Sequence, residues 1–282
     1  MEKVFITDLD GTLLNDDGQL SDESRRILTA LIDKGVKFTV ASARSIDSIR
    51  EVVKDLPINL PIIEFNGSYI SDYYSGEKLL VNHMNRNHNE KIYNIIESHD
   101  VSMIITTHEN DSDYLNFNTK NMKPGVLNYI DYRRSHDNGR LVDTENMKRV
   151  LDKDIICFNV IDKEKIVKEI HDKLIETFGD ELEVHMMGGT CSEEWYWLNV
   201  ADPSGTKAHA VKTFKEMFLK ETDVLYVFGD NNNDLGMFEA ADVPVALENS
   251  ILQLKQLSKV QIGYNYDNSV AEYIKKECGK LL

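Results

Sequence analysis

The sequence predicts an α/β protein with a doubly wound, Rossmann-like parallel sheet that is interrupted by an inserted α+β domain. Short apolar runs alternate with helical patterns at both ends of the chain, and this alternation is typical of a parallel sheet. In the middle of the chain this alternation gives way to a mixed pattern of helices and strands. A length of 282 residues also exceeds one ordinary domain. We expect a core of residues 1–82 and 191–282 and an inserted domain of residues 83–190.

The core elements follow from apolar periodicity and from residues that begin or end helices. Ser21 is a typical helix N-cap and Gly35 a typical helix end, so the apolar stripe between them predicts a helix. The other elements expected before the insert are strands at 3–7, 36–41 and 61–65, a helix at 45–54, and a hairpin of "SYIS" with "KLLV" after the turn Asn66-Gly67. After the insert we expect a helix following Pro203, a strand at 224–230, a helix at 234–241, a strand at 243–247 and a final helix at 271–276.

The inserted domain shows a mixed pattern of helices and strands. The elements expected there are helices at 90–98 and 163–178, a further helix before residue 155, and strands at 101–107, 114–118, 155–161 and 181–187. The polar stretch 121–139 receives no assignment. Aromatic residues of "WYW" at 195–197 lie near the expected return to the core, where we expect them to pack in the interior.

Composition and charge exclude several classes of function. A net charge of -16 repels nucleic acid and anionic membranes, which require basic surfaces. No apolar run approaches the ~20 residues that span a bilayer, and the N-terminus has no signal-peptide pattern, so we expect a cytoplasmic protein. Cys157, Cys191 and Cys278 are widely separated, which predicts free thiols rather than a zinc site or a disulfide framework.

Two acidic loops follow predicted buried strands. Asp8 and Asp10 come directly after the first strand, and "GDNNND" at 229–234 follows a later one. Ligands of open α/β sheets bind at the carboxyl ends of the strands, and Mg²⁺ prefers oxygen ligands. Alone, the first loop is equally well explained as a solvated turn, and the second as a polar loop that caps the next helix. Together they favour a metal site built from Asp8, Asp230 and a backbone carbonyl near Asp10.

The order of these motifs resembles the haloacid dehalogenase superfamily over essentially the whole chain. Its four motifs correspond here to "DLDGTLL", "SAR" at 42–44, Lys207 and "GDNNND". The position and size of the insert resemble the C2B cap of the Cof-like, subclass IIB sugar phosphatases, as do "FNGS" at 65–68 and "ALENS" at 246–250. The resemblance implies a Mg²⁺-dependent phosphatase of small phosphorylated metabolites, with a cap that closes over the site.

The resemblance also implies a role for each matching residue. Asp8 corresponds to the nucleophile that forms an aspartyl phosphate, and Asp10 to the general acid and base. Lys207 corresponds to the cation that neutralises phosphoryl oxygens. Mg²⁺ is expected on Asp8, Asp10 and Asp230, with Asn233 and Asp234 supporting it. The residues expected to contact substrate are Ser42, Ala43, Arg44, Asn66, Gly67 and Lys207.

Two other functions remain open on the sequence. A sugar phosphomutase of the same fold passes the phosphoryl group back to another hydroxyl group of the sugar. A noncatalytic protein that binds phosphorylated metabolites would keep the fold without turnover, although the presence of all four motifs argues against it. The pattern does not distinguish a monomer from a homodimer.

Overall fold

The computed structural model describes residues 2–134, 139–188 and 194–279. The chain forms two compact units. The core unit comprises Met1–Val81 and Thr206–Leu282, and the inserted unit comprises Asn82–Gly205. Each unit has its own sheets and its own hydrophobic core, which accords with the length of the chain.

The core unit is built on a five-stranded sheet in the order β14-β13-β12-β1-β2, and every neighbouring pair is parallel. The strands are β1 (Lys3–Thr7), β2 (Lys37–Val40), β12 (Val224–Gly229), β13 (Val243–Leu247) and β14 (Val260–Ile262). Helices cover both faces of this sheet, so the predicted doubly wound α/β class is confirmed. β1 is the inner strand between β2 and β12, which places its carboxyl end near the middle of the sheet edge.

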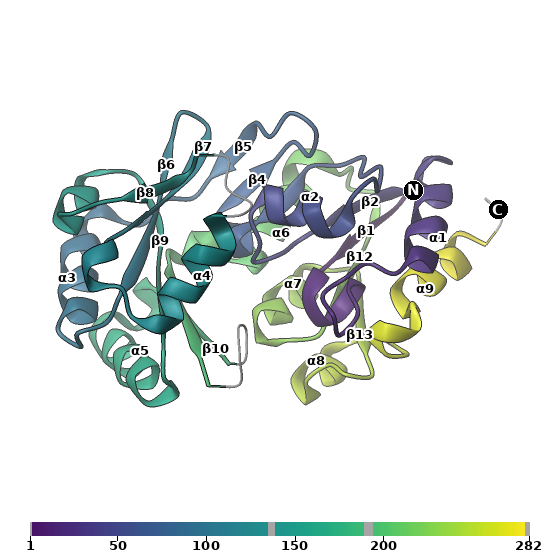
Figure 1. Cartoon of the computed structure of the whole chain (residues 1–282). Coiled ribbons are helices and arrows are strands. Elements are labelled where there is room, and N and C mark those ends of the chain that lie inside the picture. Colours follow the sequence, from purple (N-terminus) through teal and green to yellow (C-terminus); the bar gives the residue numbers. More distant parts are fainter. Residues whose placement is uncertain (1, 135–138, 189–193, 280–282) are drawn as a thin grey trace. The chain divides into compact units, whose positions relative to one another are not determined.

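Alternate residues of β1 face the two helical layers. Phe5 packs with α1, α2 and α9, whereas Val4 and Ile6 pack with α6, α7 and α8. All the residues of β1 after Lys3 are buried, as expected for a strand covered on both faces. The helices are α1 (Asp22–Ile32), α2 (Ile46–Val53), α6 (Lys207–Phe218), α7 (Leu235–Ala240), α8 (Leu252–Leu257) and α9 (Ser269–Cys278) (Figure 1).

A small antiparallel sheet extends the core unit beyond β2. It consists of β3 (Ile62–Glu64), β4 (Tyr69–Ser71) and β5 (Lys78–Val81), in that order. An isolated parallel bridge between Ala41 and Ile63 joins it to the end of β2. The expected hairpin is confirmed, because β4 pairs with β5 in antiparallel orientation.

The inserted unit contains a six-stranded mixed sheet in the order β10-β11-β9-β6-β7-β8. All its neighbouring pairs are antiparallel except β7 with β8. Helices α3 and α5 pack on one face, and α4 packs on the other. The elements are α3 (Arg86–Glu97), β6 (Met103–Glu109), β7 (Ser112–Phe117), α4 (Pro124–Arg134), β8 (Leu141–Asp143), β9 (Ile155–Asp162), α5 (Glu164–Phe178), β10 (Glu183–Gly188) and β11 (Tyr196–Ala201). The unit is therefore α+β, as expected.

The second boundary of the insert differs from the expected one. The expected division between residues 190 and 191 lies outside the described residues, as does Cys191. The two units divide after Gly205, because β11 pairs with β9 and β10 of the inserted sheet. "WYW" therefore lies in the inserted unit, where Trp195 is buried against α4.

Five elements of the described chain have no counterpart in the sequence prediction. Helix α4 occupies most of the polar stretch left unassigned. The others are strands β8 and β11 of the inserted unit, helix α8, and the short edge strand β14 that follows it. No helix in the described part of the chain is long and apolar enough to cross a bilayer. Cys157 is buried and Cys278 half-buried, and both are free thiols.

Candidate active site

Asp8 follows β1 directly and is fixed at the carboxyl edge of the core sheet. Its backbone N–H donates to the carbonyl of Phe228 at 3.0 Å, which holds it to the end of β12. The chain then turns sharply, with Gly11 at φ +75. A Cβ atom on Gly11 would lie 2.5 Å from Oδ2 of Asp230, so only glycine fits this turn. The turn therefore brings the first acidic loop against the second.

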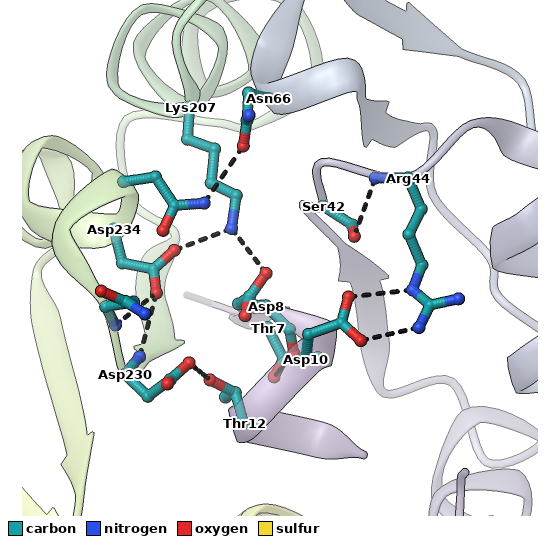
Figure 2. A network of polar contacts seen from close by, with 12 residues as sticks. Thr7, Asp8, Asp10, Thr12, Ser42, Arg44, Asn66, Lys207, Asp230 and Asp234 are labelled. Atoms are coloured by element: carbon teal, nitrogen blue, oxygen red, sulfur yellow. Dashed lines mark hydrogen bonds and ion pairs between the residues drawn. The ribbon is translucent and has the colours of Figure 1, made fainter. Parts of the chain in front are cut away.

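Lys207 lies at the first position of α6 and is 1% exposed. Its Nζ donates to Oδ1 of Asp8 at 2.5 Å and to Oδ1 of Asp234 at 2.8 Å. Burial alone would lower the pKa of Lys207, but the Asp234 and Asp8 carboxylates raise it above its usual range. The side chain is therefore a permanent cation placed beside Asp8 (Figure 2).

Asp234 holds the second acidic loop together. One carboxylate oxygen accepts from Lys207, and the other accepts from the backbone N–H groups of Asp230 and Asn231 at 2.9 Å and 3.1 Å. Both oxygens of this fully buried carboxylate are thus engaged. Asp234 orients Lys207 and the loop, while Asp230 extends toward the first loop and accepts from Oγ1 of Thr12 at 2.8 Å.

The buried carboxylates form a group that fits a cation. Oxygens of Asp8, Asp230 and Asp234 lie within 4.8 Å of one another, and it is the one group of three or more His, Cys, Asp or Glu with such spacing in the described ranges. Burial and the neighbouring carboxylates raise the pKa of Asp8 and raise that of Asp230 to about 6. Among the described residues, Lys207 is the one buried cation that forms ion pairs with this cluster, so negative charge remains in excess. A hard divalent cation would offset this excess.

Asp10 directs its side chain away from this cluster. Arg44 donates from Nε to Oδ2 of Asp10 at 2.8 Å and from Nη2 to Oδ1 at 2.7 Å. Figure 2 shows the carboxylate turned toward Arg44 and away from Lys207. Asp10 would therefore reach a metal ion only through its backbone. The two-point contact fixes its direction, although a pair that is partly exposed adds little stability.

Ser42 and the residues after it form the loop between β2 and α2. Ser42 is fully buried, and its Oγ accepts from the backbone N–H of Arg44 at 3.2 Å. Ala43 lies exposed between these two residues. This loop borders Asp10 through Arg44, so the first two predicted motifs meet in the structure.

Asn66 and Gly67 occupy the turn between β3 and β4. Asn66 has φ +55, and its side-chain oxygen accepts from Nδ2 of Asn233 at 3.1 Å. Gly67 has φ +108, and a Cβ atom there would collide with the carbonyl oxygen of Thr206. The turn thus packs against the start of α6, which positions Lys207. Asn66 and Gly67 lie beside the cluster, while their predicted contact with substrate stays a prediction.

Two further residues support the loops of the site. Thr12 hydrogen-bonds Asp230, and the side chain of Asn249 donates to the carbonyl of Gly11 at 2.7 Å. Thr12 belongs to the motif "DLDGTLL", and its position in that motif is the sequence feature that could have identified it as a site residue. Asn249 belongs to "ALENS" and holds the backbone of the first acidic loop.

Comparison with known proteins agrees with this geometry. The model of the haloacid dehalogenase-like hydrolase family matches residues 5–274. The chain belongs to this family. The motif order had predicted this membership, which is confirmed.

A curated relative of this hydrolase is 5-amino-6-(5-phospho-D-ribitylamino)uracil phosphatase YwtE of Bacillus subtilis (strain 168). It is 27% identical over 96% of each chain. Among solved structures, TM0651 of Thermotoga maritima has 26% identity and a TM-score of 0.77, covering 98% of this chain and 97% of that one. The subclass IIB sugar phosphatase BT4131 shares the fold, with 18% identity, a TM-score of 0.74 and coverage of 99% and 100%. The protein is thus a hydrolase whose relatives include named phosphatases.

Proposed function

We propose that this hydrolase is a Mg²⁺-dependent phosphatase of small phosphate monoesters that uses Asp8 as its nucleophile. The observation that carries the proposal is the buried contact of Lys207 with both Asp8 and Asp234. A lysine fixed in this way keeps its charge beside Asp8 and can attract an anionic phosphoryl group. Relatives with phosphatase names support the same reaction.

The reaction proceeds in two steps. A carboxylate oxygen of Asp8 attacks phosphorus, the ester P–O bond breaks, and Asp10, in its protonated form, gives its proton to the departing alkoxide and becomes a carboxylate. The products at that stage are an alcohol and an aspartyl phosphate. Asp10 then accepts a proton from water, whose oxygen attacks phosphorus, and the acyl phosphate bond breaks. Inorganic phosphate leaves, and Asp8 is again a carboxylate.

The metal site would comprise Asp8, Asp230 and the backbone carbonyl of Asp10. The fit rests on the excess of buried negative charge at this cluster. Bound Mg²⁺ supplies positive charge that allows an anionic phosphate to approach an anionic nucleophile. Asp234 and Asn233 would hold the surrounding loop, since Asp234 uses both of its oxygens within the protein.

The phosphoryl group would be bound by the loop after β2. We assign the Ser42 hydroxyl and the Ala43 backbone N–H to nonbridging oxygens, with Lys207 on the same group. Arg44 keeps the Asp10 carboxylate in place through its two-point contact. Asn66 and Gly67 complete this side of the pocket near the start of α6.

The substrate class would be sugar phosphates or similar phosphorylated metabolites. One relative carries the name of a phosphatase acting on a phosphorylated ribitylaminouracil, which is a small phosphate monoester. The net charge of -16 disfavours nucleic acid and anionic membrane surfaces as partners. We place the protein in the cytoplasm, as a monomer or a homodimer.

Phosphate release from a panel of esters tests this function. The panel would contain hexose and pentose phosphates, nucleotides, flavin mononucleotide, pyridoxal phosphate and 5-amino-6-(5-phospho-D-ribitylamino)uracil. We expect release with Mg²⁺, little release with EDTA, and none from Asp8→Asn. Formation of an isomeric sugar phosphate without phosphate release would instead show a mutase. Mg²⁺ binding without turnover of any ester would show a binding protein.

A further inference from the structure

A buried carboxylate lies behind the loop that carries Ser42 and Arg44. Glu64 ends β3, its side chain is fully buried, and no catalytic motif includes it. One carboxylate oxygen accepts from the backbone N–H of Ile46 at 2.5 Å. The other accepts from Oγ of Ser71 at 2.6 Å and from Nζ of Lys78. Glu64 therefore ties one helix to two strands.

The contact with Ile46 replaces an ordinary helix cap. Helix α2 begins at Ile46, and the preceding Ser45 has the backbone conformation of an N-cap. Its side chain makes no capping hydrogen bond, and its buried Oγ has no partner among the residues that the structure describes. Glu64 supplies the acceptor from a different strand, with a negative charge at the positive end of the helix.

The same strand end also holds the loop by its backbone. The N–H of Ser42 donates to the carbonyl of Ile63, and the N–H of Asn66 donates to the carbonyl of Ser42, both at 2.9 Å. The N–H of Phe65 donates to the carbonyl of Arg44 at 3.1 Å. These contacts fix residues 42 and 44, and the carboxylate of Glu64 fixes the point where the loop enters α2. The loop is thus bound at both ends to residues 63–66.

Lys78 neutralises the buried charge. The side chains of Lys78 and Glu64 are 2% and 0% exposed, and the ammonium group lies over the ring of Tyr69 at 4.7 Å from its centroid. A buried ion pair of this kind commonly adds little net stability relative to apolar residues of similar size, because both charges lose their hydration. Stability alone therefore gives a poor account of this pair, whereas orientation of the loop gives a direct one.

We infer that Glu64 is a positioning residue for the loop from Ser42 to Ser45, with Lys78 as its counter-ion. This inference rests on the proposed function, in which Ser42 binds the phosphoryl group and Arg44 holds Asp10. Glu64 does not belong to the cluster of Asp8, Asp230 and Asp234, and its hydrogen bond to Ile46 connects it to the start of α2. Loss of its carboxylate should weaken phosphate binding and turnover while leaving the metal cluster intact.

The main test replaces both charges with apolar side chains of similar size, in Glu64→Leu/Lys78→Met. We expect the thermal midpoint to stay near that of the natural protein, since no buried charge is left unpaired. We expect kcat/KM to fall about 10- to 100-fold, because a displacement of about 1 Å can cost that much. Competitive inhibition by inorganic phosphate should weaken in parallel, and the thermal shift produced by Mg²⁺ should persist.

A rescue variant and a matched control separate positioning from packing. In Glu64→Gln/Lys78→Met the amide oxygen can again accept from Ile46, so kcat/KM should return to within a few-fold of the natural value. The control is Asp242→Asn/Lys215→Met. Asp242 also accepts from a backbone N–H, that of Leu225 at 2.8 Å, and from a lysine, Lys215 at 3.0 Å, but away from the loop. The control double variant should leave competitive inhibition by inorganic phosphate unchanged.

Three results would overturn the inference: full kcat/KM in the Leu/Met variant, no recovery in the Gln/Met variant, or an equal loss in the control. If the Leu/Met variant does not fold, Glu64→Asp keeps the charge but shortens the reach to Ile46, and it should lower kcat/KM about 10-fold. If the natural protein hydrolyses no ester, the proposed function fails, and hydrogen exchange of the Ile46 backbone N–H tests the inference separately. Faster exchange of this N–H in the Leu/Met variant than in the natural protein supports the positioning role of Glu64, and unchanged exchange contradicts it.

Discussion

Lys207 donates to Oδ1 of Asp8 over 2.5 Å, in an ion pair whose side chains are 0% and 8% exposed. Asp234 accepts from the same ammonium group and also binds the backbone of the second acidic loop. A single lysine thus links the carboxyl ends of β1 and β12, and it compensates only part of the negative charge collected there. Asp8 is thereby held in direction, and the remaining negative charge favours a cation beside it.

The first prediction concerns the nucleophile. Asp8→Asn should lower phosphate release by at least ~10³-fold, because an amide cannot form the acyl phosphate. The fold should survive, since Lys207 keeps its ion pair with Asp234. Phosphate release and circular dichroism measure the two effects, with the exposed Asp17→Asn as control. Turnover of Asp8→Asn at the natural rate would rule out the proposed mechanism.

The second prediction concerns the metal. Mg²⁺ should raise the thermal midpoint of the natural protein. At a free Mg²⁺ concentration of 100 times the dissociation constant, binding adds about 2.7 kcal/mol to the free energy of unfolding. Asp230→Asn should remove most of this response, because it deletes a carboxylate of the buried cluster. Thermal denaturation with increasing MgCl₂ and after EDTA treatment measures it without any substrate. An equal Mg²⁺ response in Asp230→Asn would place the metal elsewhere.

The sequence predicted the meeting of the two acidic loops for a physical reason. Asp8 and Asp230 each follow a buried strand, and parallel strands end at the same edge of a sheet, so strand type and motif position were sufficient. The family resemblance supplied Lys207, which periodicity alone would not distinguish from a surface lysine. The core helices likewise followed from apolar spacing and from caps such as Ser21.

Lateral contacts were not predictable in the same way. The residue pattern of "YWLNVA" fits a strand of either the core sheet or the inserted sheet. Only its pairing with β9 and β10 assigns it to the inserted unit. The contact of Arg44 with Asp10 depends on side-chain direction, and that of Glu64 with Lys78 joins two strands of a small sheet. Periodicity describes which face a residue occupies, but it does not specify its partner across a sheet.

The third prediction concerns the turn after Asp8. Gly11→Ala should lower turnover and weaken the Mg²⁺ response, because its Cβ would meet Oδ2 of Asp230 at 2.5 Å. The matched control is Gly35→Ala. Gly35 also has positive φ, +90, but nothing lies within 4 Å of its Cβ position. Each variant should lose about 1 kcal/mol of stability from backbone strain, and only Gly11→Ala should affect the site. Equal losses of turnover in both variants would show that the close approach of Gly11 to Asp230 has no specific role in the site.

The fourth prediction concerns the contact between Arg44 and Asp10. Asp10→Asn should slow turnover about 10²- to 10⁴-fold, as expected for loss of a general acid and base. Arg44→Leu should slow it less, because the carboxylate remains but is no longer held in direction. If Arg44 acts through Asp10, the double variant should be little slower than Asp10→Asn alone. Values of kcat and KM for all four proteins measure this coupling.

A surface pair with the same geometry provides the control for that cycle. Arg26 donates from Nε and Nη2 to Glu23 at 2.9 Å and 2.6 Å, on the exposed side of α1. Arg26→Leu should leave kcat and KM unchanged. This result would show that removal of a two-point arginine contact does not by itself affect activity. Fully additive losses from Arg44→Leu and Asp10→Asn would show that Arg44 acts independently of Asp10. Arg44 would then contact the substrate itself, and orientation of Asp10 would have to come from another group.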